Sequence, residues 1–193
     1  QAAIHAVVAA IEHGVSGVVG LHLEGPHLSF KRKGAHDPSL IRAMTDDDLN
    51  MIIKAAEQLP NIMLTIAPEN VTVDQVSALY KAGVIVSLGH TDASYDVCMD
   101  YIANGARCTT HLFNANSQIT SREPGLVGAT LDNGAVSAGI IADGIHVHPV
   151  SIRTALRANQ GAGQIFLVSD AMATVGSDIT EFKLNGRVIH RRN

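Results

Sequence analysis

The fold of this chain is decided by the stretch Val84-Ile85-Val86-Ser87-Leu88-Gly89-His90. Its apolar run is broken only by one serine, which is typical of a strand buried on both faces of a parallel sheet. A helical pattern precedes the run: Thr72 and Gln75 match a helix start, and Gly83 matches a helix stop. The strand ends in a histidine, so the same stretch supplies both a core strand and a titratable side chain.

The same alternation of strand and helix extends in both directions from this stretch. Apolar runs predict strands at residues 17–24, 62–67, 84–89, 107–112, 135–142 and 164–169. Helical periodicity or capping signals, such as Thr45 with Asp48, predict helices at 4–11, 45–56, 72–83, 92–104 and 149–159. Strands separated by helices predict an α/β fold with a parallel sheet and right-handed crossovers. The more polar segment from Gly176 to Asn193 contains Asn185-Gly186, which predicts a hairpin turn.

Composition excludes several classes of protein. The chain has 193 residues, 46% of them hydrophobic and 17% charged, with a formal net charge of −4. Aromatic residues make up 4% and tryptophan is absent, so a nucleic-acid surface is not expected. No apolar run approaches the roughly 18 residues of a membrane span, so no membrane association is expected. The two cysteines indicate a reducing, cytoplasmic setting rather than a disulfide framework.

Titratable side chains recur at the ends of the predicted strands. Because ligands bind at the carboxyl ends of parallel strands, these groups are expected to face one site. Two histidines with a carboxylate are a typical donor set for a catalytic divalent metal, and a further carboxylate could move protons. A single histidine at a strand end is more often a packed residue, so the recurrence carries the argument. His22 either orients a ligand or simply packs. In strand order the groups are Glu24, Glu69, His90, His111, Asp143 with His146, and Asp170.

The sequence around these positions resembles the N-acetylglucosamine-6-phosphate deacetylases of the amidohydrolase superfamily. The resemblance implies a (β/α)8 barrel of the metal-dependent hydrolase type. It also implies the hydrolysis of N-acetyl-D-glucosamine 6-phosphate to D-glucosamine 6-phosphate and acetate, in amino-sugar catabolism. There are two alternatives to this function: another amide hydrolase of the superfamily, or a non-catalytic barrel fragment that binds sugar phosphate. The matching segments run in order through nearly the whole chain: His22-Leu23-Glu24-Gly25-Pro26, Gly34-Ala35-His36, Thr65-Ile66-Ala67-Pro68-Glu69, Ser87-Leu88-Gly89-His90-Thr91, Thr110-His111-Leu112-Phe113-Asn114-Ala115, Arg122-Glu123-Pro124-Gly125, Ala142-Asp143-Gly144-Ile145-His146 and Ser169-Asp170-Ala171.

The resemblance also implies roles for individual residues. Glu24, His90 and His111 match ligands of one divalent ion, with zinc expected and iron, cobalt or manganese as alternatives. Asp170 matches the catalytic acid and base, and His36 matches a residue near the acetyl carbonyl. Arg122 matches a phosphate contact that reaches across a homodimer, which suits the planar fork of arginine. The remaining substrate positions are Ala35, Asn114, Ala115 and His146.

The chain departs from the family pattern in several places. Asn116 stands where the family more often has methionine, a difference expected to affect packing more than chemistry. His27 and Ser29 also differ, and the superfamily's first strand, with its His-x-His pair, has no counterpart. A complete barrel of this kind needs about 250 residues. We therefore expect a partial barrel of about six units over residues 1–175, and a closing segment, 176–193, leading towards a missing small β-sandwich.

Overall fold

A sheet of six parallel strands forms the centre of the computed structural model, which describes residues 1–172 and 174–191. The spatial order of the strands is their order in the sequence, and each neighbouring pair is parallel. Such an order requires every connection to cross in the same sense, as in a barrel. The strands are β1 (Leu21–Glu24), β2 (Ile62–Ile66), β3 (Ile85–Leu88), β4 (Ala106–Thr109), β5 (Ser137–Ile140) and β6 (Ile165–Leu167).

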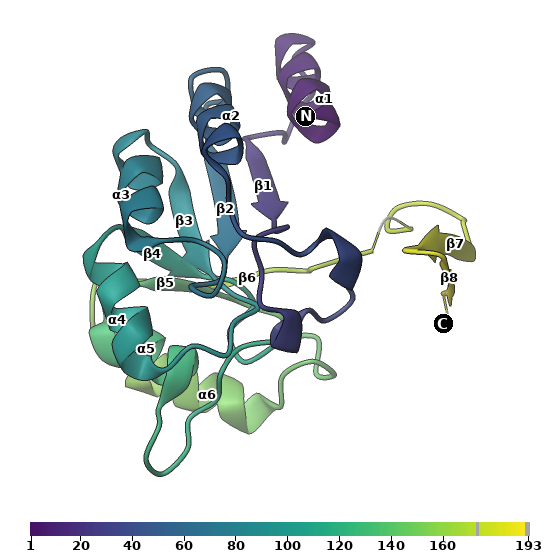
Figure 1. Cartoon of the computed structure of the whole chain (residues 1–193). Coiled ribbons are helices and arrows are strands. Elements are labelled where there is room, and N and C mark those ends of the chain that lie inside the picture. The colour runs from purple at the N-terminus through teal and green to yellow at the C-terminus, as the bar shows by residue number, and fades with distance from the viewer. Residues whose placement is uncertain (173, 192–193) are drawn as a thin grey trace.

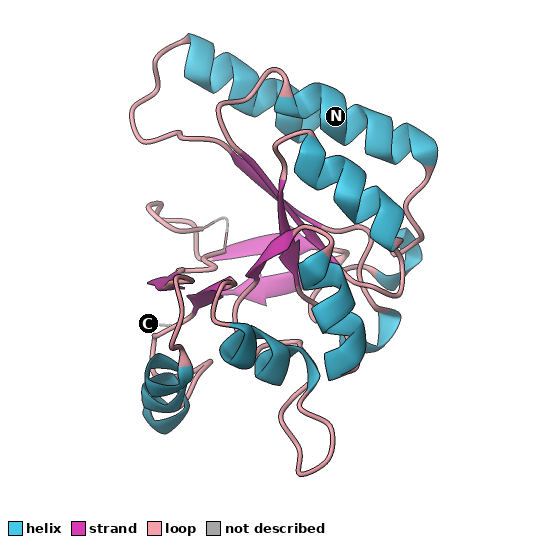
Figure 2. Cartoon of the chain, turned by 90° about the vertical axis from the view of Figure 1, so that its left-hand side faces the viewer, coloured by secondary structure: helices cyan, strands magenta, loops and turns pink. Residues whose placement is uncertain are grey.

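Helices surround the outer face of this sheet. Figure 1 shows them as an arc around the strands, and the view turned by 90° in Figure 2 keeps the strands inside and the helices outside. The sheet curls, but β1 and β6 remain its two edges within the described chain. The prediction of a partial barrel with about six units is therefore confirmed. The helices are α1 (Ala2–Glu12), α2 (Asp46–Ala56), α3 (Val73–Lys81), α4 (Tyr95–Ala103), α5 (Gly125–Asn133) and α6 (Pro149–Ala158).

Two helices begin with the capping boxes that the sequence predicts. The Thr45 side chain accepts a hydrogen bond from the Asp48 backbone N–H, and the Asp48 carboxylate accepts one from the Thr45 backbone. Thr72 and Gln75 make the same exchange at the start of α3. Such a cap contributes about 0.5–2 kcal/mol to stability. These caps therefore define the first residues of α2 and α3.

The core lies between the central strands and the helices. Residues of β2 and β3 such as Leu64 and Leu88 are at most 1% exposed, as expected of strands covered on both faces. At the edge of the sheet, Leu167 of β6 is 76% exposed. The middle of the sheet is thus well buried, whereas its β6 edge is exposed.

Some elements were not predicted. No helix or strand was expected between residues 112 and 135, yet α5 starts at Gly125. The segment Gly125–Asn133 has few strong helix formers, and burial of Leu126 and Val127 stabilises the helix instead. Two short 3₁₀ helices, η1 (Phe30–Arg32) and η2 (Pro38–Leu40), interrupt a region for which no element was predicted.

The closing segment forms the predicted hairpin. Strands β7 (Glu181–Leu184) and β8 (Arg187–His190) pair antiparallel. The turn residues Asn185 and Gly186 have φ values of 48° and 75°, which a type I′ turn requires. The domain boundary at 175 stays a prediction, and residues 173, 192 and 193 lie outside the described part of the chain. Over the residues described, no helix is long and apolar enough to cross a membrane.

Candidate metal centre and active site

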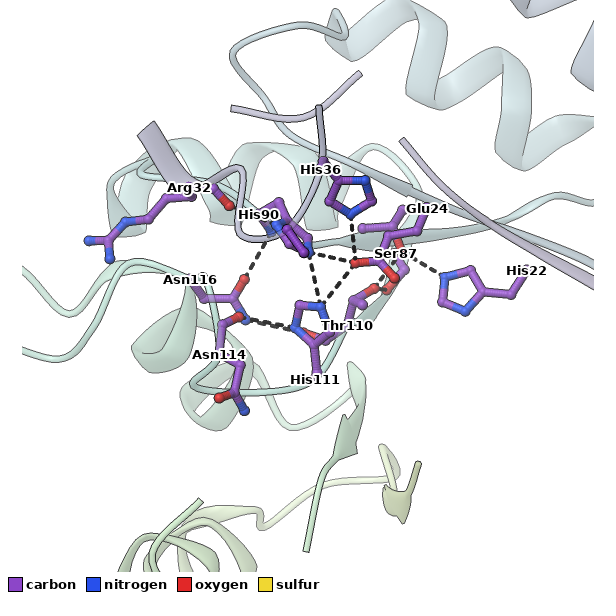
Figure 3. Close-up of polar contacts among 12 residues, drawn as sticks. His22, Glu24, Arg32, His36, Ser87, His90, Thr110, His111, Asn114 and Asn116 are labelled. Atoms are coloured by element: carbon purple, nitrogen blue, oxygen red, sulfur yellow. Dashed lines mark hydrogen bonds and ion pairs between the residues drawn. The ribbon is translucent and has the colours of Figure 1, made fainter. Parts of the chain in front are cut away.

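Four side chains assigned from the sequence to metal or substrate come together at the carboxyl edge of the sheet (Figure 3). Glu24 is the last residue of β1, and His90 and His111 each follow their strand by two residues. His36 comes from the loop between η1 and η2. We call Glu24, His36, His90 and His111 the ligand cluster. Parallel strands and one long β1–β2 connection therefore bring together residues that lie up to 87 positions apart.

The donor atoms of the ligand cluster are close to one another. Glu24 Oε1 lies 2.5 Å from His90 Nε2, 3.1 Å from His111 Nε2 and 3.4 Å from His36 Nε2. The Nε2 atoms of His90 and His111 are 3.1 Å apart. Glu24, His36 and His90 form a group whose ligand atoms all lie within 4.8 Å. His111 is at least as close to Glu24 as His36 is, so the predicted ligand set of Glu24, His90 and His111 is also compact.

The other ring nitrogen of each buried histidine identifies its tautomer. His90 Nδ1 is 2.7 Å from the backbone oxygen of Arg32, and His111 Nδ1 is 3.0 Å from that of Asn114. A carbonyl oxygen only accepts, so each Nδ1 must carry the proton. In a neutral ring, each Nε2 then presents a lone pair towards Glu24. Lone pairs and a carboxylate oxygen at these separations repel one another unless protons or a cation lie between them, so the donor set fits a divalent metal.

The ionisation of the ligand cluster reflects the same crowding. Burial alone would raise the pKa of Glu24. When protons rather than a cation lie between these atoms, hydrogen bonds from His111, His36 and His90 outweigh burial and hold the pKa of Glu24 far below its usual range. Burial would lower the pKa of His111, yet the hydrogen bond and charge of Glu24 raise it overall. Glu24 is therefore a carboxylate at neutral pH, the charged form in which it can bind a cation.

The backbone at this edge is strained. A left-handed conformation costs an ordinary residue roughly 1–2 kcal/mol and persists only where the surroundings impose it, often at functional sites. Of six non-glycine residues with positive φ in the described chain, five lie in loops at this edge of the sheet. The five are His90 (48°), His111 (29°), Phe113 (81°), Ala115 (52°) and Asp170 (47°).

Asp170 shares a cavity with the ligand cluster. It follows β6 and is exposed, and with Glu24 and His111 it lines a cavity of about 290 Å³. Its charge is one of the smaller influences that raise the pKa of His111. The predicted catalytic carboxylate therefore follows the last strand, β6, and lines the same cavity as the predicted metal ligands Glu24 and His111.

A row of hydroxyl groups runs below the ligand cluster. His22 Nε2 lies 2.7 Å from Thr65 Oγ1, which lies 2.6 Å from Thr110 Oγ1, and Ser87 Oγ is 2.7 Å from the same Thr110 oxygen. In the described contacts, His22 therefore hydrogen-bonds to a hydroxyl group and to no member of the ligand cluster, so it neither orients a ligand directly nor packs only against apolar groups. Three members of this hydrogen-bonded row, His22, Ser87 and Thr110, line the cavity.

The groups after β5 stay apart from the ligand cluster in the described contacts. His146 Nδ1 lies 2.6 Å from Asp143 Oδ2, and both side chains are exposed. Backbone N–H groups of His146 and Ile145 also donate to Asp143, and these bonds lower the pKa of Asp143 to about 2. The contact of His146 with a substrate stays a prediction.

The other predicted substrate residues lie on the loops that follow β1 and β4. Asn114 has a buried Nδ2 with no hydrogen-bond partner among the described residues, and Arg122 lies exposed in the loop before α5. The β7–β8 hairpin contacts Ala35: the Ala35 backbone oxygen accepts hydrogen bonds from Asn185 Nδ2 at 2.9 Å and from the Arg187 guanidinium at 3.3 Å. The orphaned amide of Asn114 is the kind of group that a polar ligand would satisfy.

Sequence reasoning missed the residues that hold the ligand cluster in place. The Arg32 guanidinium donates to Asp92 at 2.9 Å, which links the loop bearing His36 to the loop bearing His90. Glu69, one of the predicted strand-end groups, accepts from the Thr91 hydroxyl at 2.7 Å and from the Asp92 backbone at 2.8 Å, so it braces that loop. Polar residues beside each motif are the only sequence signal for these contacts.

Fold and site together define an open half of a parallel α/β barrel, with donors for a divalent cation at the carboxyl edge. No family model matches the chain. It is 43% identical to the N-acetylgalactosamine-6-phosphate deacetylase of Shewanella sp. (strain ANA-3), over 98% of this chain and 48% of the relative. It is 37% identical to the N-acetylglucosamine-6-phosphate deacetylase of Haemophilus influenzae, over 89% of this chain and 45% of that relative.

Solved structures give the same result. The N-acetylglucosamine-6-phosphate deacetylase of Pasteurella multocida superposes with a TM-score of 0.89 at 35% identity, covering 98% of this chain and 49% of that one. A mutant of the Mycobacterium smegmatis enzyme, in complex with N-acetyl-D-glucosamine-6-phosphate, gives a TM-score of 0.84 at 35% identity, covering 97% and 49%. The resemblance predicted from the motifs is confirmed. The chain spans about half the length of the curated relatives it matches.

Proposed function

We propose that this chain carries the metal centre of an amide hydrolase that removes acetate from N-acetyl-D-glucosamine 6-phosphate, leaving D-glucosamine 6-phosphate. The observation that supports it most is the convergence of His90 Nε2 and His111 Nε2 on Glu24 Oε1, at 2.5 and 3.1 Å. The names of the similar proteins suggest the substrate, and the ligand cluster suggests the reaction type.

Each residue of the site has a separate task in this proposal. A divalent ion held by Glu24, His90 and His111 would lower the pKa of a water molecule and polarise the amide carbonyl. Asp170 takes a proton from the attacking water and delivers it to the amide nitrogen as the C–N bond breaks. His36 donates a hydrogen bond to the acetyl oxygen. Zinc suits two imidazoles and one carboxylate, with iron, cobalt and manganese as alternatives.

The loops would recognise the sugar phosphate. The Arg122 guanidinium offers a bidentate fork to the phosphate, and Ala35, Asn114, Ala115 and His146 surround the sugar. Pairing of two copies, in which Arg122 reaches the neighbouring site, and a cytoplasmic location both stay predictions.

The proposal is tested by measuring bound metal and acetate release in the same preparation. We expect about one divalent ion per chain, acetate release that is lost after chelation, and recovery when zinc is returned. Metal without acetate release would instead favour a non-catalytic sugar-phosphate-binding fragment.

A second substrate has a specific observation in its favour. The relative with 43% identity is an N-acetylgalactosamine-6-phosphate deacetylase, whereas the N-acetylglucosamine-6-phosphate deacetylase of Haemophilus influenzae is 37% identical. The two sugars differ only in the configuration at C4, so both place the acetamide and the phosphate alike. Comparing kcat/KM on the two phosphorylated sugars decides between them, and a ratio above ten for the galacto sugar would overturn our first choice.

A further inference from the structure

Asn116 connects two members of the ligand cluster through their backbones. Its side chain is fully buried, with 0% exposure. Its Oδ1 accepts a hydrogen bond from the His90 backbone N–H at 3.1 Å, and its Nδ2 donates to the Thr110 backbone oxygen at 3.1 Å (Figure 3). One amide therefore holds the ligand His90 itself and the residue directly before the ligand His111.

Both of these backbone segments need to be held. His90 and His111 have φ values of 48° and 29°, in the left-handed region that ordinary residues rarely occupy. A residue keeps such a conformation only where several contacts impose it. The Asn116 amide supplies one contact to each segment. A β-bridge between Thr91 and Asn116 also holds the backbone of Asn116 against the loop that bears His90.

An asparagine side chain is suited to this place because it offers an acceptor and a donor at once. The His90 backbone N–H needs an acceptor, and the Thr110 carbonyl needs a donor. An apolar side chain of similar size would leave both buried groups without partners. A hydroxyl carries its donor and its acceptor on a single oxygen, so it cannot span the two partners as the separate Oδ1 and Nδ2 atoms do.

We propose that Asn116 is a positioning residue of the metal centre, which sets the separation of the His90 and His111 imidazoles before an ion binds. This role rests on the proposed function, since it needs the ligand cluster to hold a metal. Asn116 touches neither ion nor substrate. It acts through the backbones of the two ligand segments. Its loss should therefore lower the affinity for Zn²⁺ while the chain still folds.

The test compares two variants at Asn116 with a matched control. Asn116→Leu removes both hydrogen bonds, and Asn116→Thr keeps one hydroxyl at similar size. Asn159→Leu is the control, because Asn159 is half-buried, donates to the Gly163 oxygen at 2.7 Å, and follows α6 where the chain turns back to the start of β6. The dissociation constant for Zn²⁺ is measured by competition with a chelator, and the melting temperature is measured on the metal-free chain.

We expect Asn116→Leu to weaken Zn²⁺ binding about 10- to 100-fold, the range found when a residue that orients metal ligands is lost. Asn116→Thr should weaken it about threefold or more, and Asn159→Leu less than twofold. The visible spectrum of the Co²⁺-substituted chain should change in Asn116→Leu and not in the control. A merely structural asparagine would lower the melting temperature without moving these readouts.

Two results would overturn the proposal. The first is Zn²⁺ affinity in Asn116→Leu within twofold of that in Asn159→Leu; if Asn116→Leu does not fold, affinity in Asn116→Thr within twofold of wild type has the same force. The second is a wild-type chain that binds no Zn²⁺, Fe²⁺, Co²⁺ or Mn²⁺. That outcome also removes the metal centre of the proposed function, whereas the first leaves it intact.

Discussion

The carboxyl ends of β1, β3 and β4 differ sharply from those of β5 and β6. At the first set, His90 and His111 are each 5% exposed, and their rings are fixed at both nitrogens. At the second, the side chains of His146 and Asp143 are 56% and 38% exposed and are paired with one another. Asp170 is exposed as well and reaches the site only across the cavity.

The difference separates two kinds of chemistry along one sheet edge. Metal ligands gain from burial, because electrostatic interactions are stronger in a medium of low dielectric and the geometry is set before the ion arrives. Groups that transfer protons or bind a phosphate must instead remain open to water and substrate. Changes at the buried ends should therefore alter metal binding, whereas changes at the exposed ends should alter turnover or substrate binding.

The largest effect is expected from Glu24→Gln. Glu24 is the single carboxylate of the ligand cluster, so its loss should weaken Zn²⁺ binding more than about 100-fold, beyond the range for residues that only orient ligands. Glu57→Gln, at the exposed end of α2, is the matched control. Competition with a chelator measures both variants. Wild-type affinity in Glu24→Gln would remove Glu24 from the metal site.

Asp170→Asn should separate the two ends of the sheet most clearly. Losing a group that moves protons should slow acetate release about 10²- to 10⁴-fold, while the metal content stays at the wild-type level. Asp178→Asn, another exposed aspartate of the described chain, should change neither quantity. Near-normal turnover in Asp170→Asn would contradict the assigned role.

Arg122→Ala should act on one class of substrate only. A charge-assisted bond to phosphate contributes about 1.5–3 kcal/mol, so kcat/KM for the phosphorylated sugar should fall about 10- to 100-fold, with little change for the unphosphorylated sugar. Arg153→Ala, on the exposed side of α6, is the control. Equal losses on both sugars would favour another amide hydrolase of the superfamily.

The smallest effect concerns the ion pair that braces the buried ends. Arg32→Gln should weaken Zn²⁺ binding a few-fold, because exposed ion pairs contribute roughly 0–1 kcal/mol. Lys31 approaches the same Asp92 carboxylate at 3.6 Å, but its side chain is 79% exposed. Lys31→Gln should therefore leave the affinity unchanged, and equal effects in the two variants would show that only the charge near Asp92 matters.

Much of the fold could be predicted because its signals are local. The apolar runs ending in Glu24, His90 and His111 give three of the six strands, and both capping boxes lie where Thr45 and Thr72 indicate. Helix α5 could not be predicted, since burial rather than local propensity stabilises it. Segments rich in glycine and alanine lack the periodic contrast on which such predictions depend.

The site was predictable only as far as its motifs reach. Position at strand ends brought together Glu24, His90 and His111, and the resemblance added His36. The supporting contacts of Asn116 and Arg32 join segments 26 and 60 residues apart. No periodicity or spacing rule predicts such pairs, because they form only when two loops come together at the carboxyl ends of the folded strands.

The most direct test of the account is a crystal structure of the zinc-loaded chain with anomalous scattering recorded at the zinc edge. We predict one peak at the carboxyl edge of the sheet, with Glu24, His90 and His111 at bonding distances of about 2.0–2.2 Å. A zinc-loaded chain with no peak there, or with its ion held by other residues, would contradict the account.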